Sequence, residues 1–181
     1  MDNLIDKSYF IREIALPEQR FGDGMDGDIK RYQPEILKML LGQTLYDDLV
    51  ANTSDAKWQA LITGYDYTVD YGGDTINVSW KGLQNSEKIS LISDYVFCKT
   101  VSDHETTTTN VGVVVANVEN SNKISATVRT SRAWNRMREL YGYSGQSKLI
   151  ASAYNFLRYN GEYDFDNWIF TELEQQNIWG I

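Results

Sequence analysis

The sequence predicts a mainly α-helical fold, a helical bundle around one long central helix, with a β-hairpin and a long extended loop. Three observations predict it. Apolar residues recur at helical spacing in several segments, one short stretch alternates apolar and polar residues around a Gly-Gly pair, and one longer stretch follows neither period. The chain has 181 residues, of which 42% are hydrophobic and 13% aromatic, and this is enough for one core of this kind.

The first part of the chain predicts an arm followed by helices. Residues 1–27 hold an apolar patch and then the glycine-rich run FGDGMDGD, which favours an N-terminal arm and loop. A helical domain is expected over 28–159. Its first helix has Pro34 where the first turn tolerates proline and ends at Gly42, and two short helices follow before Gly64.

The period of the sequence changes at about residues 65–80. Two runs of alternating apolar and polar residues flank Gly72-Gly73, a pattern typical of a β-hairpin. From Ser86 to Glu105 the apolar residues cover most of a helix circumference, which predicts the buried central helix.

The extended segment is expected at about residues 106–126, where β-branched threonine and valine dominate. Val113, Val114 and Val115 lie in its uncharged middle. Soluble proteins do not leave an apolar strand edge bare, because such edges aggregate. We therefore expect this segment to pack on an adjacent copy of the chain, with these three valines among the contact residues.

Two more helices are predicted, over 127–141 and 146–159, with Leu149 and Ile150 on the apolar face of the second. The spacing of three arginines places them in one basic stripe on the first of these helices. We interpret the stripe as a candidate contact with an acidic surface, although a solvated helix face is the competing interpretation. The stripe consists of Arg129, Arg132 and Arg136.

The acidic C-terminal tail, residues 160–181, carries a net charge of −5, directly after a stretch, 129–159, with a net charge of +5. Trp168, Phe170 and Trp179 are its candidate anchors, because desolvated aromatic side chains are frequent hot spots of interfaces. The tail is expected to reach another subunit or a partner. A tail folded back on its own core is the alternative.

Composition and charge argue against several functional classes. The formal net charge of −8 disfavours general affinity for nucleic acid. Cys98 and His104 are the single cysteine and the single histidine, which excludes an internal disulfide, a multi-cysteine zinc site and any metal site with two imidazoles. No apolar run approaches the roughly 20 residues of a membrane-spanning helix, and the first residues lack the pattern of a signal peptide.

Catalytic chemistry has weak support. The side chains of Asp103, His104 and Glu105 point in different directions on a helix and do not converge on one atom, so a solvated or capping role is favoured for the histidine. No nucleophile, base and oxyanion donor can be combined into a site. We expect no catalytic, cofactor-binding or metal-binding residues, and no cofactor.

The order of landmarks from about residue 30 to residue 142 resembles a head–tail connector protein (neck, ring or head-completion protein) of tailed bacteriophages, of the type found in crAss-like and related phages. The resemblance is one of pattern and order and not of a catalytic signature. It also includes the predicted central helix. Its other matching stretches are Leu40–Leu49, Trp58–Gly64, Trp80–Leu83, Thr107–Val114, Glu119–Asn120 and Arg132–Met137.

The resemblance implies a structural virion protein without enzymatic activity. Such proteins form a homo-oligomeric, dodecameric ring in the phage neck, bind the portal protein and other neck or tail proteins, and continue the DNA channel through which the viral genome is ejected. DNA would pass through the lumen without sequence-specific binding, and no membrane would be involved. The expected location is the head–tail junction of the virion, after synthesis in the host cytoplasm.

Two other classes remain open from the sequence. One is a small helical adaptor or regulatory protein that acts as a monomer or dimer without enzymatic activity. The other is a hydrolase or nuclease with a carboxylate metal site. Its candidate ligands are Asp23, Asp26, Asp28, Asp47 and Asp48.

Overall fold

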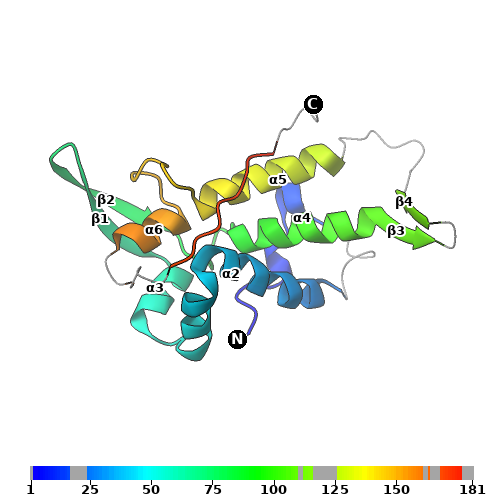
Figure 1. Ribbon diagram of the computed structural model, residues 1–181, viewed down its shortest axis with the longest axis horizontal. Coiled ribbons are helices and arrows are strands. Elements are labelled where there is room, and N and C mark those ends of the chain that lie inside the picture. The colour runs from blue at the N-terminus through cyan, green and yellow to red at the C-terminus, as the bar shows by residue number, and fades with distance from the viewer. Residues whose placement is uncertain are drawn as a thin grey trace.

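The computed structural model describes residues 2–16, 24–109, 112–115, 126–160, 163 and 168–176. It confirms the predicted fold class, a mainly α protein with a β-hairpin. Three long helices, α2, α4 and α5, form an elongated body, and a two-stranded hairpin lies at each end of it (Figure 1).

Helix α4, Leu91–Glu105, is the predicted central helix. Its first eight residues, 91–98, are all buried. It packs against α5, Ala126–Tyr141, and against α2, Met25–Ala51. The sequence predicted burial on several sides from apolar residues around most of the helix circumference, and this holds for the first half of α4, whereas Ser102 and Asp103 are exposed.

Helix α2 is kinked at Gly42, where the backbone has φ 71° and ψ 170°. Nearly all residues other than glycine avoid this region of backbone space. The sequence predicted that the helix ends at Gly42. In the structure α2 bends at this residue and then continues as a second helical part to Ala51. The helix also starts earlier than expected, which places Pro34 in its interior and not in its first turn. A buried apolar stripe offsets the cost of that proline; it includes Ile29, Ile36, Leu37, Leu40 and Leu41.

The first hairpin pairs β1, Tyr65–Tyr71, with β2, Asp74–Trp80, in an antiparallel register around Gly72-Gly73. Both glycines have positive φ, 64° and 98°, as a tight two-residue hairpin turn requires. Helix α3, Ala56–Thr63, precedes this hairpin, and α6, Ala153–Tyr159, packs against β1. The hairpin prediction is thus confirmed.

The second hairpin lies in the segment that was predicted to be extended. Strand β3, Thr106–Thr109, pairs antiparallel with β4, Gly112–Val115. Residues 116–125 of the predicted segment lie outside the described residues. Helix α5 begins at Ala126, one residue before the predicted start.

Two helices start later than the sequence predicted. Helix α4 begins at Leu91 and not at Ser86, because Lys88 has a left-handed backbone, φ 57°. The preceding turn is closed by two hydrogen bonds between the Asn85 side chain and the backbone of Ile89. The hydroxyl of Ser90 then accepts from the N–H of Ile92 and caps the helix.

The last helix shows the same deviation. Helix α6 begins at Ala153 and not at residue 146, so the predicted apolar face loses Leu149 and Ile150, which are 38% and 46% exposed. The Asn155 side chain donates to the carbonyl oxygens of Ser147 and Ile150, which holds the preceding residues in turns. An asparagine that binds the backbone in this way competes with helix formation.

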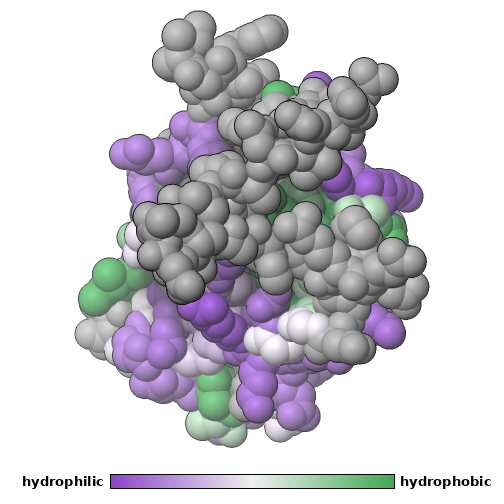
Figure 2. All heavy atoms as spheres, turned by 90° about the vertical axis from the view of Figure 1, so that its right-hand side faces the viewer, coloured by the Kyte–Doolittle hydropathy of each residue, from purple (hydrophilic) through white to green (hydrophobic). Residues whose placement is uncertain are grey.

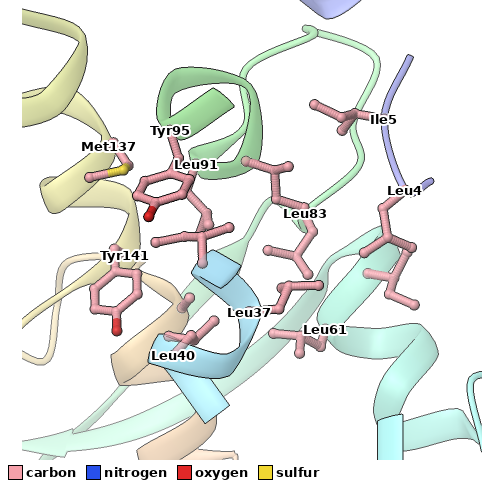
Figure 3. Close-up of a cluster of buried hydrophobic side chains, with 14 of the residues drawn as sticks. Leu4, Ile5, Leu37, Leu40, Leu61, Leu83, Leu91, Tyr95, Met137 and Tyr141 are labelled. Carbon is pink, nitrogen blue, oxygen red and sulfur yellow. The ribbon is translucent and has the colours of Figure 1, made fainter. Parts of the chain in front are cut away.

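The N-terminal segment belongs to the core of the helical domain. It contains two short 3-10 helices, η1, Lys7–Tyr9, and η2, Arg12–Ile14. Five of its apolar side chains are buried, and Leu4 and Ile5 point toward side chains of α2, α3 and α4 (Figure 3). The five are Leu4, Ile5, Tyr9, Phe10 and Ile14.

The C-terminal residues 168–176 cross the helical body as an extended strap between α2 and α5 (Figure 1, red). The Trp168 indole donates to the carbonyl oxygen of Leu40 at 2.8 Å, and the N–H of Thr171 donates to that of Met39 at 3.0 Å. These carbonyls lie directly before the kink, where a helix end needs partners from outside. The strap therefore caps the first half of α2.

The Gly42→Ala variant should lose about 2 kcal/mol of stability, because alanine is strained at this backbone conformation. In addition, a Cβ atom at Gly42 would lie only 3.0 Å from the carbonyl oxygen of Ile169 in the strap. Urea unfolding measures the loss. Gly27→Ala in the same helix is the matched control, since a Cβ atom there meets nothing within 4 Å. Equal stabilities of the two variants would contradict the prediction.

Candidate interaction surfaces

Two of the three arginines in the predicted basic stripe bind other parts of the same chain. Arg136 forms a bidentate pair with Asp94 of α4, with its Nε at 2.8 Å from Oδ2 and its second nitrogen on Oδ1. The carboxylate of Asp94 is 1% exposed. Arg136 also lies 3.5 Å from a carboxylate oxygen of Glu13.

Burial raises the pKa of the Asp94 carboxyl, and the hydrogen bonds from Arg136 oppose this rise. The same hydrogen bonds raise the pKa of the Arg136 guanidinium, so the arginine stays charged. A buried carboxylate without its cation is costly. The pair therefore fixes how α5 sits on α4.

Arg129 holds the N-terminal segment. Its guanidinium donates to the backbone carbonyl oxygens of Glu13 at 2.7 Å and of Ala15 at 2.9 Å. Of the three arginines, Arg132 is the exposed one. The candidate contact surface of α5 is thereby reduced to the neighbourhood of Arg132, while Arg129 and Arg136 hold the fold together.

Sequence reasoning missed the role of Asp94. The signal was present, since Asp94 lies among apolar residues that cover most of the circumference of the predicted helix, and a buried carboxylate must be paired. Its partner was not readable, because Arg136 lies on another helix, 42 positions later.

The candidate contact residues Val113, Val114 and Val115 form most of strand β4. Their side chains lie outside the described part of the structure. The backbone of the β3–β4 hairpin projects from the end of α4, opposite to the β1–β2 hairpin (Figure 1). In the described part of the chain, β3 and β4 pair only with each other.

The face at the β3–β4 end is mostly hydrophilic where it is described, with apolar residues in separate small patches (Figure 2). Near this end lie the start of α2, the end of α4 and the start of α5 (Figure 1). At the opposite end, the outward face of the β1–β2 hairpin is polar, and Tyr65 and Tyr71 are 54% and 49% exposed.

The predicted anchors of the tail lie in different places. Trp168 and Phe170 are half-buried and contact the ring of Tyr154 at 5.3 and 4.7 Å between centroids. Both therefore pack on their own chain. For residues 168–176, the tail folds back on its own core, which is the alternative given in the sequence analysis. Ile169 between them is 72% exposed. Trp179 lies outside the described residues.

The candidate chemical groups do not converge where the structure describes them. Asp26 and Asp28 lie at the start of α2, and Asp47 and Asp48 lie at its far end, while Asp23 is not among the described residues. Within the described ranges, no group of three or more histidine, cysteine or acidic residues is placed to hold a metal ion. Helices of the described residues also lack the combination of length and hydrophobicity that crossing a membrane requires.

Cys98 is buried in α4, and burial raises its pKa to about 12. Its thiol donates to the carbonyl oxygen of Thr130 in α5 at 3.5 Å. A thiol with so high a pKa is a poor nucleophile at neutral pH. The side chain of His104 lies outside the described part.

Comparisons with protein-family models, with curated proteins and with solved structures find no match to this chain. The functional argument therefore rests on the sequence pattern and on the geometry described above.

Arg136→Ala should destabilise the protein by about 3–5 kcal/mol, because it leaves the Asp94 carboxylate buried without its cation. Arg132→Ala on the same helix is the matched control and should change stability by less than about 0.5 kcal/mol, since its side chain is exposed. Urea unfolding followed by circular dichroism compares the two. Similar losses for both variants would refute the structural role of Arg136.

Proposed function

We propose that this chain is a structural virion protein that forms a ring in the neck of a tailed bacteriophage, where it connects the portal to the tail and continues the DNA channel. The proposal starts from the resemblance of residues 30–142 to head–tail connector proteins. The single observation that carries it further is the β3–β4 hairpin, which projects from the helical body opposite to the β1–β2 hairpin.

A two-stranded hairpin on its own is marginally stable in water. Strands β3 and β4 contain Thr106–Thr109 and Gly112–Val115, all of them uncharged. An uncharged strand edge gains stability when another chain covers it, and it invites aggregation when it stays bare. A neighbouring copy in a ring would supply this cover.

The arrangement of the ends suits a ring. A heterologous contact joins two different surfaces of the same protein, and it closes into a ring when the rotation between copies permits. Here the two hairpins lie at opposite ends of one helical body. The net charge of −8 is also suited to a channel wall, because an acidic lumen repels phosphate and lets DNA slide.

The double variant Val113→Asp/Val115→Asp tests the hairpin contact, because alternate strand residues share one face. The wild-type chain should form rings, alone or on the portal protein of the same phage, and the double variant should stay monomeric with unchanged helicity. Native mass spectrometry and electron microscopy report the assembly.

The matched control for this test is Asn3→Asp/Ser8→Asp, which places two charges at exposed positions of the N-terminal segment, outside both hairpins. It should assemble like the wild type. Rings of the Val113→Asp/Val115→Asp variant would contradict the hairpin contact. A wild-type chain that stays a monomer or dimer even with portal protein would instead favour the small helical adaptor.

The exposed Arg132 generates a separate prediction. If it meets an acidic surface of a partner copy, then Arg132→Glu should slow ring assembly at low salt more than at high salt, because salt screens exposed charges. Time-resolved light scattering measures the rate. Lys148→Glu is the control for a general charge effect. An assembly rate with no salt-dependent change would remove Arg132 from the interface.

A further inference from the structure

A small hollow of about 40 Å³ lies between the N-terminal segment, the residues before α4 and helix α5. Three positively charged side chains line it, one from each of these parts: Arg12, Lys88 and Arg136. Among the described residues, no acidic side chain lines this hollow. Positive charge therefore gathers at one place on a chain whose net charge is −8.

Two of these cations have an unusual backbone conformation. Arg12 and Lys88 have φ values of 55° and 57°, and in the described part of the chain they are the only residues other than glycine with positive φ. Such conformations are uncommon for arginine and lysine, and they are frequent at ligand-binding sites. A glycine would form either turn without strain. The turns alone therefore do not explain why a charged residue stands at both positions.

The three cations differ in their partners. Arg136 already pairs with Asp94 and Glu13. Arg12 and Lys88 form no ion pair with any residue that the structure describes. Two positive charges beside one hollow repel each other, and an anion bound between them replaces this repulsion with attraction.

The side chain of Lys88 is held at the hollow. Its ammonium lies 4.5 Å from the ring centre of Tyr9, and the hydroxyl of this tyrosine accepts from the N–H of Asn85 at 3.1 Å. The Asp6 carboxylate interacts with Lys88 electrostatically, but it accepts from the N–H of Ser8 at 2.7 Å, and hydrogen bonding to Ser8 lowers its pKa more than Lys88 does. Lys88 is thus positioned in advance for a further anion.

The size and the lining of the hollow favour a carboxylate group. One water molecule needs about 10–15 Å³ of cavity volume, so the hollow has room for roughly three groups of this size, as many as the heavy atoms of a carboxylate. Ile11, Ile14 and Ile89 also line it, and Ile11 is 37% exposed. These side chains can contact the carbon atoms next to a carboxylate, which an inorganic anion lacks.

We propose that this hollow binds the carboxylate group of an organic acid between Arg12 and Lys88, with Arg136 as a third positive neighbour. The group belongs either to a free small acid or to an aspartate or glutamate side chain of another protein. This inference is independent of the proposed function, because it concerns a site on the isolated chain.

Nuclear magnetic resonance titration of the full chain tests the site with two probes. Sodium acetate represents the free acid, and the capped tripeptide acetyl-leucyl-glutamyl-leucinamide represents the side chain of a protein. The amide signals of Arg12, Lys88 and Ile89 should shift and saturate, whereas sodium chloride at equal ionic strength should not shift them. The probe that saturates at the lower concentration identifies the source of the carboxylate.

Lys88→Gln removes one charge and should weaken binding of the better probe by about tenfold, because a charge-assisted hydrogen bond is lost. Lys88→Gly should weaken it equally, and glycine suits the positive φ, so a folding defect would not explain the loss. Circular dichroism checks the fold of both variants. Lys30→Gln removes an exposed cation of α2 outside the hollow and should bind like the wild type.

Three results would overturn the proposal. The first is the absence of a saturable shift with both carboxylate probes. The second is saturation by inorganic phosphate at a lower concentration than by either carboxylate, since the site would then select another class of anion. The third is equal binding by Lys88→Gln and Lys30→Gln, because the shifts would then report general screening of charge.

Discussion

A carboxylate that is closed off from water sets the arrangement of the helices. Asp94 is the only charged residue among the fully buried ones that the structure describes, and it lies in the helix that every other long helix contacts. Its two oxygens are both taken by Arg136. The same guanidinium lies 3.5 Å from a Glu13 carboxylate oxygen, so one arginine with two ion pairs relates α4, α5 and the N-terminal segment to one another. Apolar packing alone would allow α5 to slide or rotate on α4, whereas a bidentate pair allows one position.

Both ends of the described chain complete the helical body. The N-terminal segment covers part of the core with Leu4 and Ile5, and Arg129 ties its end to α5. The strap of residues 168–176 supplies partners to the carbonyls before the Gly42 kink. Segments that the sequence separates into an arm, a domain and a tail thus share one hydrophobic core.

The sequence analysis succeeded where structure is set by near neighbours. The β1–β2 hairpin follows from alternation and from the Gly72-Gly73 turn, and α5 follows from its apolar period. It failed where a side chain replaces a helical hydrogen bond, as Asn85 and Asn155 do before α4 and α6. Apolar periodicity does not register such bonds.

Contacts between residues far apart in the sequence could not be predicted either. The three arginines of the basic stripe lie on α5, but the use of Arg136 inside the fold depends on Asp94 and Glu13, which no local pattern connects to it. The position of Trp168 depends on a carbonyl 128 residues earlier. A single sequence does not show which distant residues pair. An aromatic residue that binds a partner therefore cannot be told, from sequence, from one that packs on its own chain.

The strap has a consequence for biosynthesis. A ribosome delivers α2 more than a hundred residues before residues 168–176, so the kink at Gly42 must wait for its cap until that later segment has emerged. Until then the carbonyls of Met39 and Leu40 bind water, and aromatic surface on α5 is uncovered. The nascent chain is therefore more vulnerable to aggregation and proteolysis until residues 168–176 have left the exit tunnel.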